Sequence, residues 1–235
     1  MPGRNILKEA AKVCQRVRGV HLTFAAPAII EMLAPELDYV YLDGEHGCFT
    51  PRDIAAHCIA AERWGLTTIA RVPENSSGVI TNFLDRGING IMVPHVESVA
   101  EAKRAVEAVY FAPLGDRSFG SGRPTYLSFK DKVAHMQECN ANMALCLMIE
   151  SRAGLAAAAE LAAVEGVDFL TFGPNDLASS LGHPGDPSHP EVKRAMEEAT
   201  KQINAAGKYT REQFMHYGWI NEVLVAGLKQ LIGSR

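Results

Sequence analysis

Residues 38–47 read Asp-Tyr-Val-Tyr-Leu-Asp-Gly-Glu-His-Gly, a short apolar run that ends in a group of charged residues. The run predicts a buried strand over Tyr39–Leu42, because aromatic, β-branched and aliphatic residues follow one another without interruption. Two carboxylates and an imidazole come directly after it, at Asp43, Glu45 and His46, and the glycine between them lets the backbone turn sharply. Charged groups are costly to bury. The stretch therefore indicates either a functional site at the carboxyl end of a strand or a polar turn that leads into a helix.

Short apolar runs alternate with longer helical patterns along the rest of the chain. Strands are predicted over residues 19–24, 39–42, 66–70, 89–93, 144–149 and 167–172, with helices between them. Strands and helices that alternate at this spacing predict a parallel sheet. Arg71, Glu150 and Asp176 follow strand ends as Asp43 does, and a (β/α)8 TIM barrel builds its active site at that edge from several strands. The sequence thus predicts such a barrel, in a single domain over residues 1–235, with a doubly wound open sheet as the alternative.

The composition is that of an ordinary globular protein, with 47% hydrophobic residues, 21% charged residues and a net charge of −4 over 235 residues. The sequence has no basic run or stripe, which argues against nucleic acid or an anionic membrane surface as a partner. None of its apolar runs is long enough to cross a bilayer. Residues 1–18 mix charged and apolar positions, so they predict an amphipathic helix over one end of the fold rather than a signal peptide.

The five cysteines are odd in number and form no C-x-x-C pair: Cys14, Cys48, Cys58, Cys139 and Cys146. This pattern fits reduced thiols better than a disulfide framework, and it predicts a cytoplasmic protein. Cys48 follows His46 closely, so a Cys/His nucleophile is one interpretation. A buried cysteine that serves as a small apolar residue is the commoner one.

Longer motifs stand in a fixed order between residues 19 and 208. They are Leu-Asp-Gly-Glu-His (42–46), Ala-Arg-Val-Pro (70–73), Gly-Ile-Met-Val-Pro-His-Val (90–96), Pro-Leu-Gly-Asp-Arg (113–117), Met-Ile-Glu-Ser (148–151), Gly-Val-Asp-Phe-Leu-Thr-Phe-Gly-Pro-Asn-Asp-Leu (166–177) and His-Pro-Glu-Val (189–192). In this order and spacing the chain resembles the HpcH/HpaI family of class II, metal-dependent pyruvate aldolases. The resemblance implies an aldolase that cleaves a 4-hydroxy-2-oxo acid to pyruvate and an aldehyde through a metal-bound pyruvate enolate.

The resemblance also implies roles for the residues at the strand ends. Glu150 and Asp176 would be the metal ligands, and an all-oxygen pair suits Mg²⁺, Mn²⁺ or Co²⁺. Arg71 would stabilise the enolate oxygen. His46 would be the general base, held by Asp43. Glu45 would contact the metal-binding and catalytic side chains without touching the substrate. The substrate carboxylate would be held by the backbone at the start of the helix after the sixth strand, at Gly173, Pro174 and Asn175.

Each of these side chains also has a purely structural interpretation. Arg71 could be only an ion pair on the rim of the barrel, and Glu150 and Asp176 could cap the helices that follow them. His95 is expected on the same face of the sheet, but it is not among the ligands that the resemblance implies. Five further histidines are expected on surfaces or in loops: His57, His135, His183, His189 and His216.

The chain departs from the family pattern in two places. Many members have Gln where Met148 stands, two positions before the metal-binding Glu. Residues 209–221 are too few to hold the seventh strand, a helix and the eighth strand, so the barrel is shortened there or lacks residues. A last helix is predicted over about 222–232, where an apolar stripe would pack on a neighbouring subunit of a homo-oligomer, a hexamer by resemblance.

Several other functions stay open at the level of the sequence. Oxaloacetate decarboxylation would use the same enolate site. A catalytically inactive barrel with a binding or assembly role would fit the short C-terminal region. A Schiff-base aldolase would need a lysine such as Lys208 at a strand end, and an acyl-CoA lyase would need a basic patch. The aldehyde acceptor is expected to depend on the Gly- and Pro-rich loop over residues 112–124.

Overall fold

The computed structural model describes residues 4–120, 122–123 and 131–233. The strands of these residues are β1 (Val17–Leu22), β2 (Tyr39–Asp43), β3 (Thr67–Arg71), β4 (Gly90–Val93), β5 (Ala144–Ile149), β6 (Phe169–Phe172) and β7 (Met215–Trp219). The helices are α1 (Ile6–Val13), α2 (Pro27–Leu33), the 3₁₀ turn η1 (Ala34–Glu36), α3 (Pro51–Arg63), α4 (Ser77–Asp85), α5 (Val99–Val109), α7 (Lys132–Ala141), α8 (Arg152–Ala156), α9 (Ala158–Ala162), α10 (Pro174–Leu181), α11 (Pro190–Ala205), α12 (Arg211–Phe214) and α13 (Ile220–Ile232). The loop predicted over 112–124 lies in part outside the described residues.

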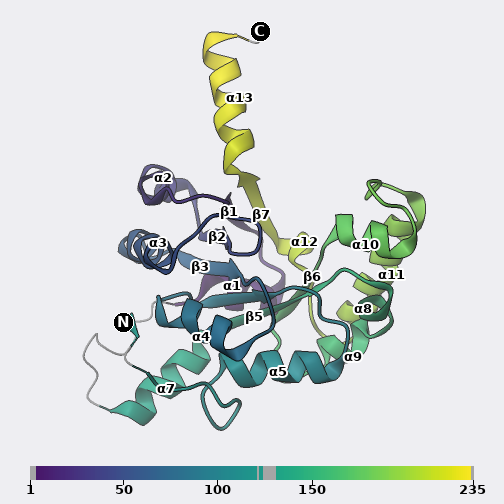
Figure 1. Cartoon of the computed structure of the whole chain (residues 1–235), viewed down its shortest axis with the longest axis horizontal. Coiled ribbons are helices and arrows are strands. Elements are labelled where there is room, and N and C mark those ends of the chain that lie inside the picture. The colour runs from purple at the N-terminus through teal and green to yellow at the C-terminus, as the bar shows by residue number, and fades with distance from the viewer. Residues whose placement is uncertain (1–3, 121, 124–130, 234–235) are drawn as a thin grey trace.

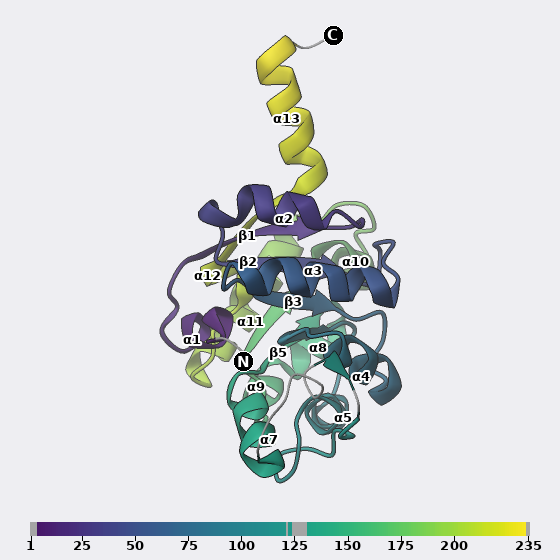
Figure 2. The same ribbon diagram turned by 90° about the vertical axis from the view of Figure 1, so that its left-hand side faces the viewer.

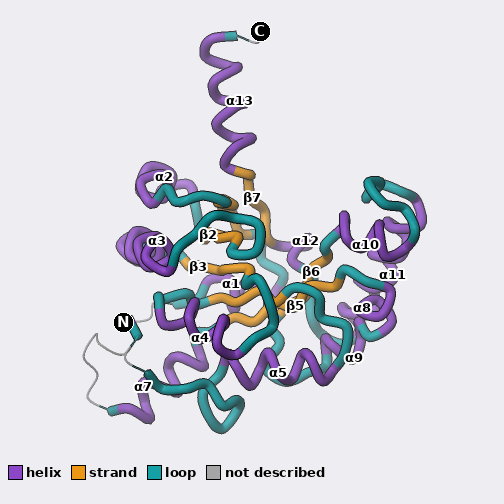
Figure 3. The backbone as a smooth tube through the Cα atoms, viewed as in Figure 1, coloured by secondary structure: helices purple, strands orange, loops and turns teal. Residues whose placement is uncertain are grey.

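The strands stand in the middle of the molecule and the helices surround them (Figure 3). All residues of β2, β4, β5 and β6 are buried, because helices cover the outer face of the sheet and side chains fill its inner face. Successive residues of β2 alternate between these two sides. Val40 and Leu42 belong to the hydrophobic core beneath the helices, whereas Tyr39 and Tyr41 belong to the inner cluster.

All neighbouring strands are parallel, in the order β6-β5-β4-β3-β2-β1-β7. The predicted α/β fold with a parallel sheet is confirmed, but the prediction of a closed (β/α)8 barrel is wrong. The sheet is a half-barrel that remains open between β6 and β7 (Figure 1). It is not a doubly wound sheet either, because the strands from β1 to β6 lie side by side in chain order without a reversal.

The half-barrel stays open because the segment between α11 and β7, residues 206–214, is too short for a further strand and helix. Thr210 forms an isolated bridge to Leu170 of β6, and the N–H of Leu170 donates to Tyr209 O at 3.2 Å. The one-turn helix α12 follows at once and leads into β7. β7 then pairs with β1, from Val17 opposite Met215 onward. As the length of this segment predicted, the strand expected beside β6 is absent, and the single bridge at Thr210 stands in its place.

Side chains of α12 occupy the gap that the missing strand leaves. The carboxylate of Glu212 accepts a hydrogen bond from the Thr171 hydroxyl at 2.7 Å and one from the Phe172 N–H at 3.3 Å, both on β6. The same oxygen accepts from Arg211 Nη2 at 2.9 Å, and Arg211 Nη1 donates to the Tyr217 hydroxyl at 2.5 Å on β7. An ion pair thus connects the two open edges and satisfies polar groups that a neighbouring strand would otherwise bind.

We expect Glu212→Ala to lower the free energy of unfolding by about 2–3 kcal/mol. The change leaves the mostly buried guanidinium of Arg211 without its carboxylate and frees the donors on β6. Urea unfolding followed by circular dichroism measures the effect. The exposed α11 residue Glu197 provides the control, because its replacement by Ala should change stability by less than about 0.5 kcal/mol. Equal stabilities of the Glu212 and Glu197 variants would contradict this role.

Helix α13 projects away from the rest of the molecule (Figures 1 and 2). It begins two residues before the predicted start. Ile220 is buried, whereas Val223, Leu224, Leu228 and Leu231 are exposed. In the described part of the chain no helix has the length and the apolar character needed to cross a membrane. The apolar surface of α13 is thus left uncovered within one chain.

Candidate active site

Asp43, the last residue of β2, is 1% exposed and is held by a guanidinium from the neighbouring strand. In the register of the sheet Asp43 lies opposite Arg71 of β3. Arg71 Nε donates to Oδ1 at 3.0 Å and Nη2 donates to Oδ2 at 2.5 Å. Oδ1 also accepts the backbone N–H groups of Glu45 and His46. The buried carboxylate therefore fixes both the arginine and the turn that follows β2.

His21 of β1 faces Asp43 from the inside of the half-barrel. Its Nε2 lies 3.5 Å from Asp43 Oδ2, and its ring stacks on Tyr41 with centroids 4.2 Å apart. Burial lowers the pKa of His21 and favours the neutral ring. Burial by itself would raise the pKa of Asp43, but His21 and Arg71 outweigh it, so this pKa lies far below its usual range. Asp43 is thus a permanent anion at neutral pH.

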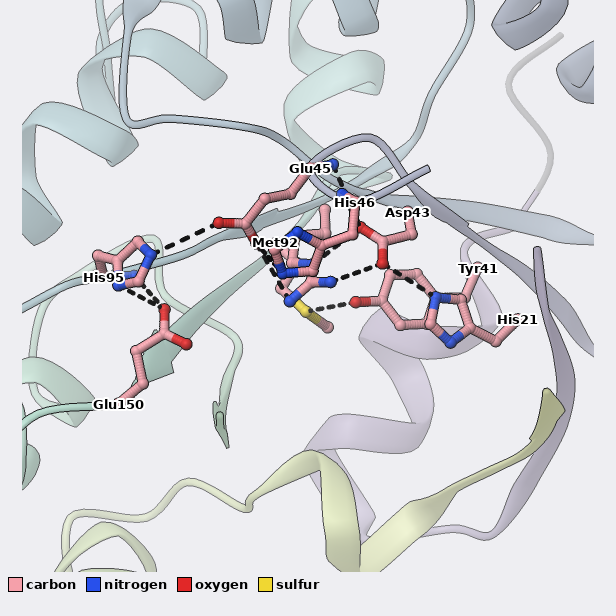
Figure 4. Close-up of polar contacts among 9 residues, drawn as sticks. His21, Tyr41, Asp43, Glu45, His46, Met92, His95 and Glu150 are labelled. Carbon is pink, nitrogen blue, oxygen red and sulfur yellow. Dashed lines mark hydrogen bonds and ion pairs between the residues drawn. The ribbon is translucent and has the colours of Figure 1, made fainter. Parts of the chain in front are cut away.

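Glu45 lies among the other charged groups at the carboxyl edge of the sheet, which is the mouth of the half-barrel (Figure 4). Its Oε2 is 3.1 Å from Arg71 Nη1 and 3.9 Å from His46 Nε2. Its Oε1 is 3.5 Å from His95 Nε2. Glu45 therefore connects the arginine to both exposed histidines.

The imidazole of His46 is 66% exposed and points into the mouth of the half-barrel. Asp43 binds the backbone N–H of His46 and not its ring, so the expected support of the imidazole by Asp43 is indirect. No described contact joins His46 to Cys48, whose Sγ lies 3.8 Å from the carbonyl of Thr23. The Cys/His nucleophile therefore gains no support.

Glu150 follows β5, and its side chain is 2% exposed. Oε1 accepts the backbone N–H of His95 at 2.7 Å, and the Nδ1 atom of the same histidine lies 3.0 Å away. Burial raises the pKa of Glu150, and the negative charge of Asp176 raises it further. A Cβ at Gly173 would collide with Oε2 of Glu150, so the glycine makes room for the carboxylate.

Asp176 lies in the first turn of α10 and is exposed. Fewer backbone N–H groups near Asp176 can bind an anion than the sequence suggested. The N–H of Gly173 donates to Ile149 O, and Pro174 has no N–H. The N–H groups of Asn175 and Asp176 remain as first-turn donors without an acceptor inside the helix. The start of α10 therefore offers two backbone donors to an anion rather than four.

These residues fit a divalent cation. Glu150 is a buried carboxylate whose partners among the described residues are both parts of His95, and its charge calls for a cation nearby. Asp176 is exposed in the first turn of α10, three residues after the Gly173 that makes room for Glu150. Oxygen donors of this kind suit Mg²⁺ and Mn²⁺.

Among the described residues, one group of three potential metal ligands has its ligand atoms all within 4.8 Å of one another; it lies between α10 and α11 and consists of His183, His189 and Glu191. His183 Nε2 lies 2.9 Å from Glu191 Oε2, and His189 Nδ1 accepts the N–H of Glu191. The two rings stack face to face with centroids 3.5 Å apart. Stacked rings direct their lone pairs side by side rather than at a common ion, so this cluster is a hydrogen-bonded clamp.

The positions of Lys208 and Met148 bear on two further expectations from the sequence. Lys208 Nζ donates to Val167 O, before the start of β6, and so lies at the amino edge of the sheet away from these groups. Met148 is buried in the inner hydrophobic cluster. Sequence reasoning missed His21, whose signal was a lone imidazole in an apolar strand. It noted the position of His95 but assigned it no role.

A parallel half-barrel with acids, imidazoles and a guanidinium at its carboxyl edge is the architecture of a barrel-type enzyme. The HpcH/HpaI aldolase/citrate lyase model matches residues 18–226, and the chain belongs to this family. The predicted family is therefore confirmed.

Named relatives narrow the class. A hydroxypyruvate/pyruvate aldolase from Sagittula stellata is 35% identical over 207 residues, which are 87% of this chain and 81% of that protein. A 4-hydroxy-2-oxo-heptane-1,7-dioate aldolase from Shigella flexneri is 32% identical over 205 residues, 87% of this chain and 77% of that protein. The crystal structure of an HpcH/HpaI aldolase/citrate lyase family protein from Burkholderia cenocepacia superposes with a TM-score of 0.87 at 28% identity, over 96% of this chain and 97% of that one. The predictions of a carbon–carbon lyase and of a class II aldolase function are confirmed.

Proposed function

We propose that this chain cleaves a 4-hydroxy-2-oxo acid to pyruvate and an aldehyde, and that Glu150 and Asp176 hold the divalent metal of the reaction. The observation that carries the proposal is the Glu150 carboxylate, which is buried at the carboxyl end of β5 and packs against Gly173, the residue before α10, three positions before Asp176. Relatives that are named as aldolases of pyruvate and of a 4-hydroxy-2-oxo diacid support a 2-oxo acid as the substrate.

Mg²⁺, Mn²⁺ or Co²⁺ would suit the oxygen donors. When bound, such an ion supplies a Lewis acid that stabilises negative charge on the keto oxygen of the substrate. The N–H groups of Asn175 and Asp176 would hold the substrate carboxylate at the start of α10, with the helix dipole in their favour. Gly173 would contribute space for Glu150 rather than a hydrogen bond. Pro174 would fix the first turn of the helix.

Arg71 would stabilise the oxygen on which charge develops when the carbon–carbon bond breaks. Its two hydrogen bonds to Asp43 hold the guanidinium plane, so little reorganisation is needed during the reaction. Glu45 would balance part of the positive charge from the other side.

His46 would act as the general base that removes the hydroxyl proton of the substrate. Its exposed ring is free to reach a substrate in the mouth, while Asp43 fixes the backbone that carries it. Oε2 of Glu45 lies 3.9 Å from Nε2 of this ring.

We further propose that the chain acts as a single domain in a cytoplasmic homo-oligomer, in which α13 packs on a neighbouring subunit. The exposed apolar residues of α13 support this proposal, since a surface of this kind is usually covered. A hexamer rests on the family resemblance alone. Light scattering gives the mass in solution, and a monomer at micromolar concentration would refute the association.

Proton exchange at the pyruvate methyl group in D₂O tests the proposed function without knowledge of the aldehyde. We expect exchange, followed by NMR, that requires Mn²⁺ or Mg²⁺ and stops when EDTA is added. Exchange that persists in EDTA, or that fails with every metal, would overturn the proposal. Oxaloacetate decarboxylation would pass through the same enolate, so its rate is measured beside aldol cleavage to separate the two activities.

A further inference from the structure

His95 joins two carboxylates across the mouth of the half-barrel (Figure 4). It follows Pro94 after the end of β4, and its imidazole is 61% exposed. Its backbone is left-handed, with a φ of 52°, a conformation that costs a residue other than glycine about 1–2 kcal/mol. Strain of this kind persists where a site requires a particular side-chain direction. Here the turn directs both the N–H and the ring of His95 at Glu150.

We propose that His95 is a third protein ligand of the divalent metal, through Nδ1, beside Glu150 and Asp176. The inference rests on the proposed function, because it extends the metal site described there. It makes the site a mixed one, with one imidazole nitrogen and two carboxylates, instead of an all-oxygen pair.

The spacing of the two ligand atoms supports this role. Nδ1 of His95 lies 3.0 Å from Oε1 of Glu150. Two atoms that bind one octahedral ion at right angles, each about 2.1 Å from it, stand about 3.0 Å apart. The nitrogen and the oxygen therefore already have the separation of adjacent ligands.

The other ring nitrogen has the partner that a ligating histidine usually has. His95 Nε2 lies 3.5 Å from Oε1 of Glu45. With an ion bound at Nδ1, the proton of the neutral ring lies on Nε2, where the Glu45 carboxylate can accept it. Glu45 is itself held by Arg71 at 3.1 Å, so the orientation of the ring is linked to the rest of the site.

His95 is distinguished from the second exposed imidazole of the mouth by its contacts. His46 lies 3.9 Å from Glu45, and no described contact joins it to Glu150. His95 alone of the two touches a proposed metal ligand. A nitrogen ligand also changes metal preference, since imidazole binds Co²⁺ well whereas Mg²⁺ strongly prefers oxygen.

Calorimetric titration of the metal-free full chain with Co²⁺ and with Mg²⁺ tests the inference. The informative variant is His95→Gly, because glycine adopts a positive φ without strain, so the turn after β4 is expected to keep its conformation. We expect His95→Gly to weaken Co²⁺ binding by at least about 10-fold and Mg²⁺ binding by less than about 3-fold. His46→Ala, which removes the other exposed imidazole beside Glu45, should leave both affinities within about 2-fold of the wild type.

Pulsed electron paramagnetic resonance of bound Mn²⁺ gives a second readout that does not depend on activity. We expect a nitrogen coupling in the wild type and in His46→Ala, and its loss in His95→Gly. Absence of the coupling in the wild type, or equal weakening of Co²⁺ and Mg²⁺ in His95→Gly, would show that His95 only hydrogen-bonds Glu150 and would overturn the inference.

The same titrations separate a failure of this inference from a failure of the proposed function. If Glu150→Ala loses metal while His95→Gly binds Co²⁺ as the wild type does, only the role of His95 is refuted. If Glu150→Ala binds metal as the wild type does, the proposed metal site itself is refuted.

Discussion

Replacement of Glu150 by Ala is expected to lower metal-dependent proton exchange of pyruvate by about 10³-fold. The buried carboxylate is the proposed metal ligand, and loss of the charge stabilisation that the ion supplies is worth about 4 kcal/mol of barrier at this fold-change. The measurement is the exchange rate in D₂O at saturating Mn²⁺. Glu97→Ala is the matched control, because Glu97 is an exposed glutamate two positions after His95, and its exchange rate should be that of the wild type.

The free energy of unfolding of metal-free Glu150→Ala shows whether the loss of exchange comes from the lost metal ligand or from misfolding. The pKa of Glu150 is raised in the folded chain, chiefly by burial, so the metal-free protein loses stability as the pH rises from the unfolded value of 4.5 through the raised folded value. Metal-free Glu150→Ala should therefore unfold at a denaturant concentration at least as high as the wild type. A variant that is inactive and also much less stable would contradict the assignment of Glu150 to the metal site.

Replacement of Arg71 by Ala is expected to reduce turnover by about 10²–10³-fold, the usual cost of removing a fixed donor from developing negative charge. It should also lower the free energy of unfolding at pH 7 by about 3–5 kcal/mol, because Asp43 is 1% exposed and would lose its guanidinium. Steady-state kinetics and urea unfolding measure the two effects. Arg104→Ala, at an exposed ion pair of α5, should change stability by less than about 0.5 kcal/mol.

The stability gap between wild type and Arg71→Ala should depend on pH. The lowered pKa of Asp43 contributes stability that is present above the unfolded value of 3.8 and is lost as the pH falls below it. Without Arg71 only His21 and the backbone oppose the effect of burial, so the pKa of Asp43 is expected to be higher than in the wild type, and protonation would relieve the unpaired charge at a higher pH. The gap should therefore narrow as the pH falls below 7, and Asp43→Asn in the variant should restore part of the stability. A gap that is independent of pH would contradict this account.

Much of the fold was predictable because parallel strands that are buried on both faces appear as uninterrupted apolar runs. The runs at 39–42, 89–93 and 144–149 became β2, β4 and β5 to within one residue at each end. The charged residues after these runs also lie where they were expected, since the carboxyl ends of parallel strands meet at one edge. Both inferences use only neighbours in the chain.

The closure of the barrel was not predictable in the same way. The length of residues 209–221 showed that a strand and a helix were missing, but not how the remaining edge is satisfied. That depends on Glu212, whose carboxylate reaches Thr171, 41 positions earlier. A short side-chain bridge of this kind leaves no periodic pattern in the sequence.

The sequence by itself determined the parallel α/β class and the position of Asp43, Arg71, Glu150 and Asp176 at or just after the carboxyl ends of the strands, where we propose the active site. Only the tertiary structure decided that the barrel stays open between β6 and β7, that Asp43 holds the backbone of His46 rather than its ring, and that His95 lies against Glu150. The physical reason is the separation along the chain between the residues that interact. Strand patterns and turns arise from residues that are close in the chain, whereas the partner of a charged side chain is set by strands that come together only when the sheet has formed.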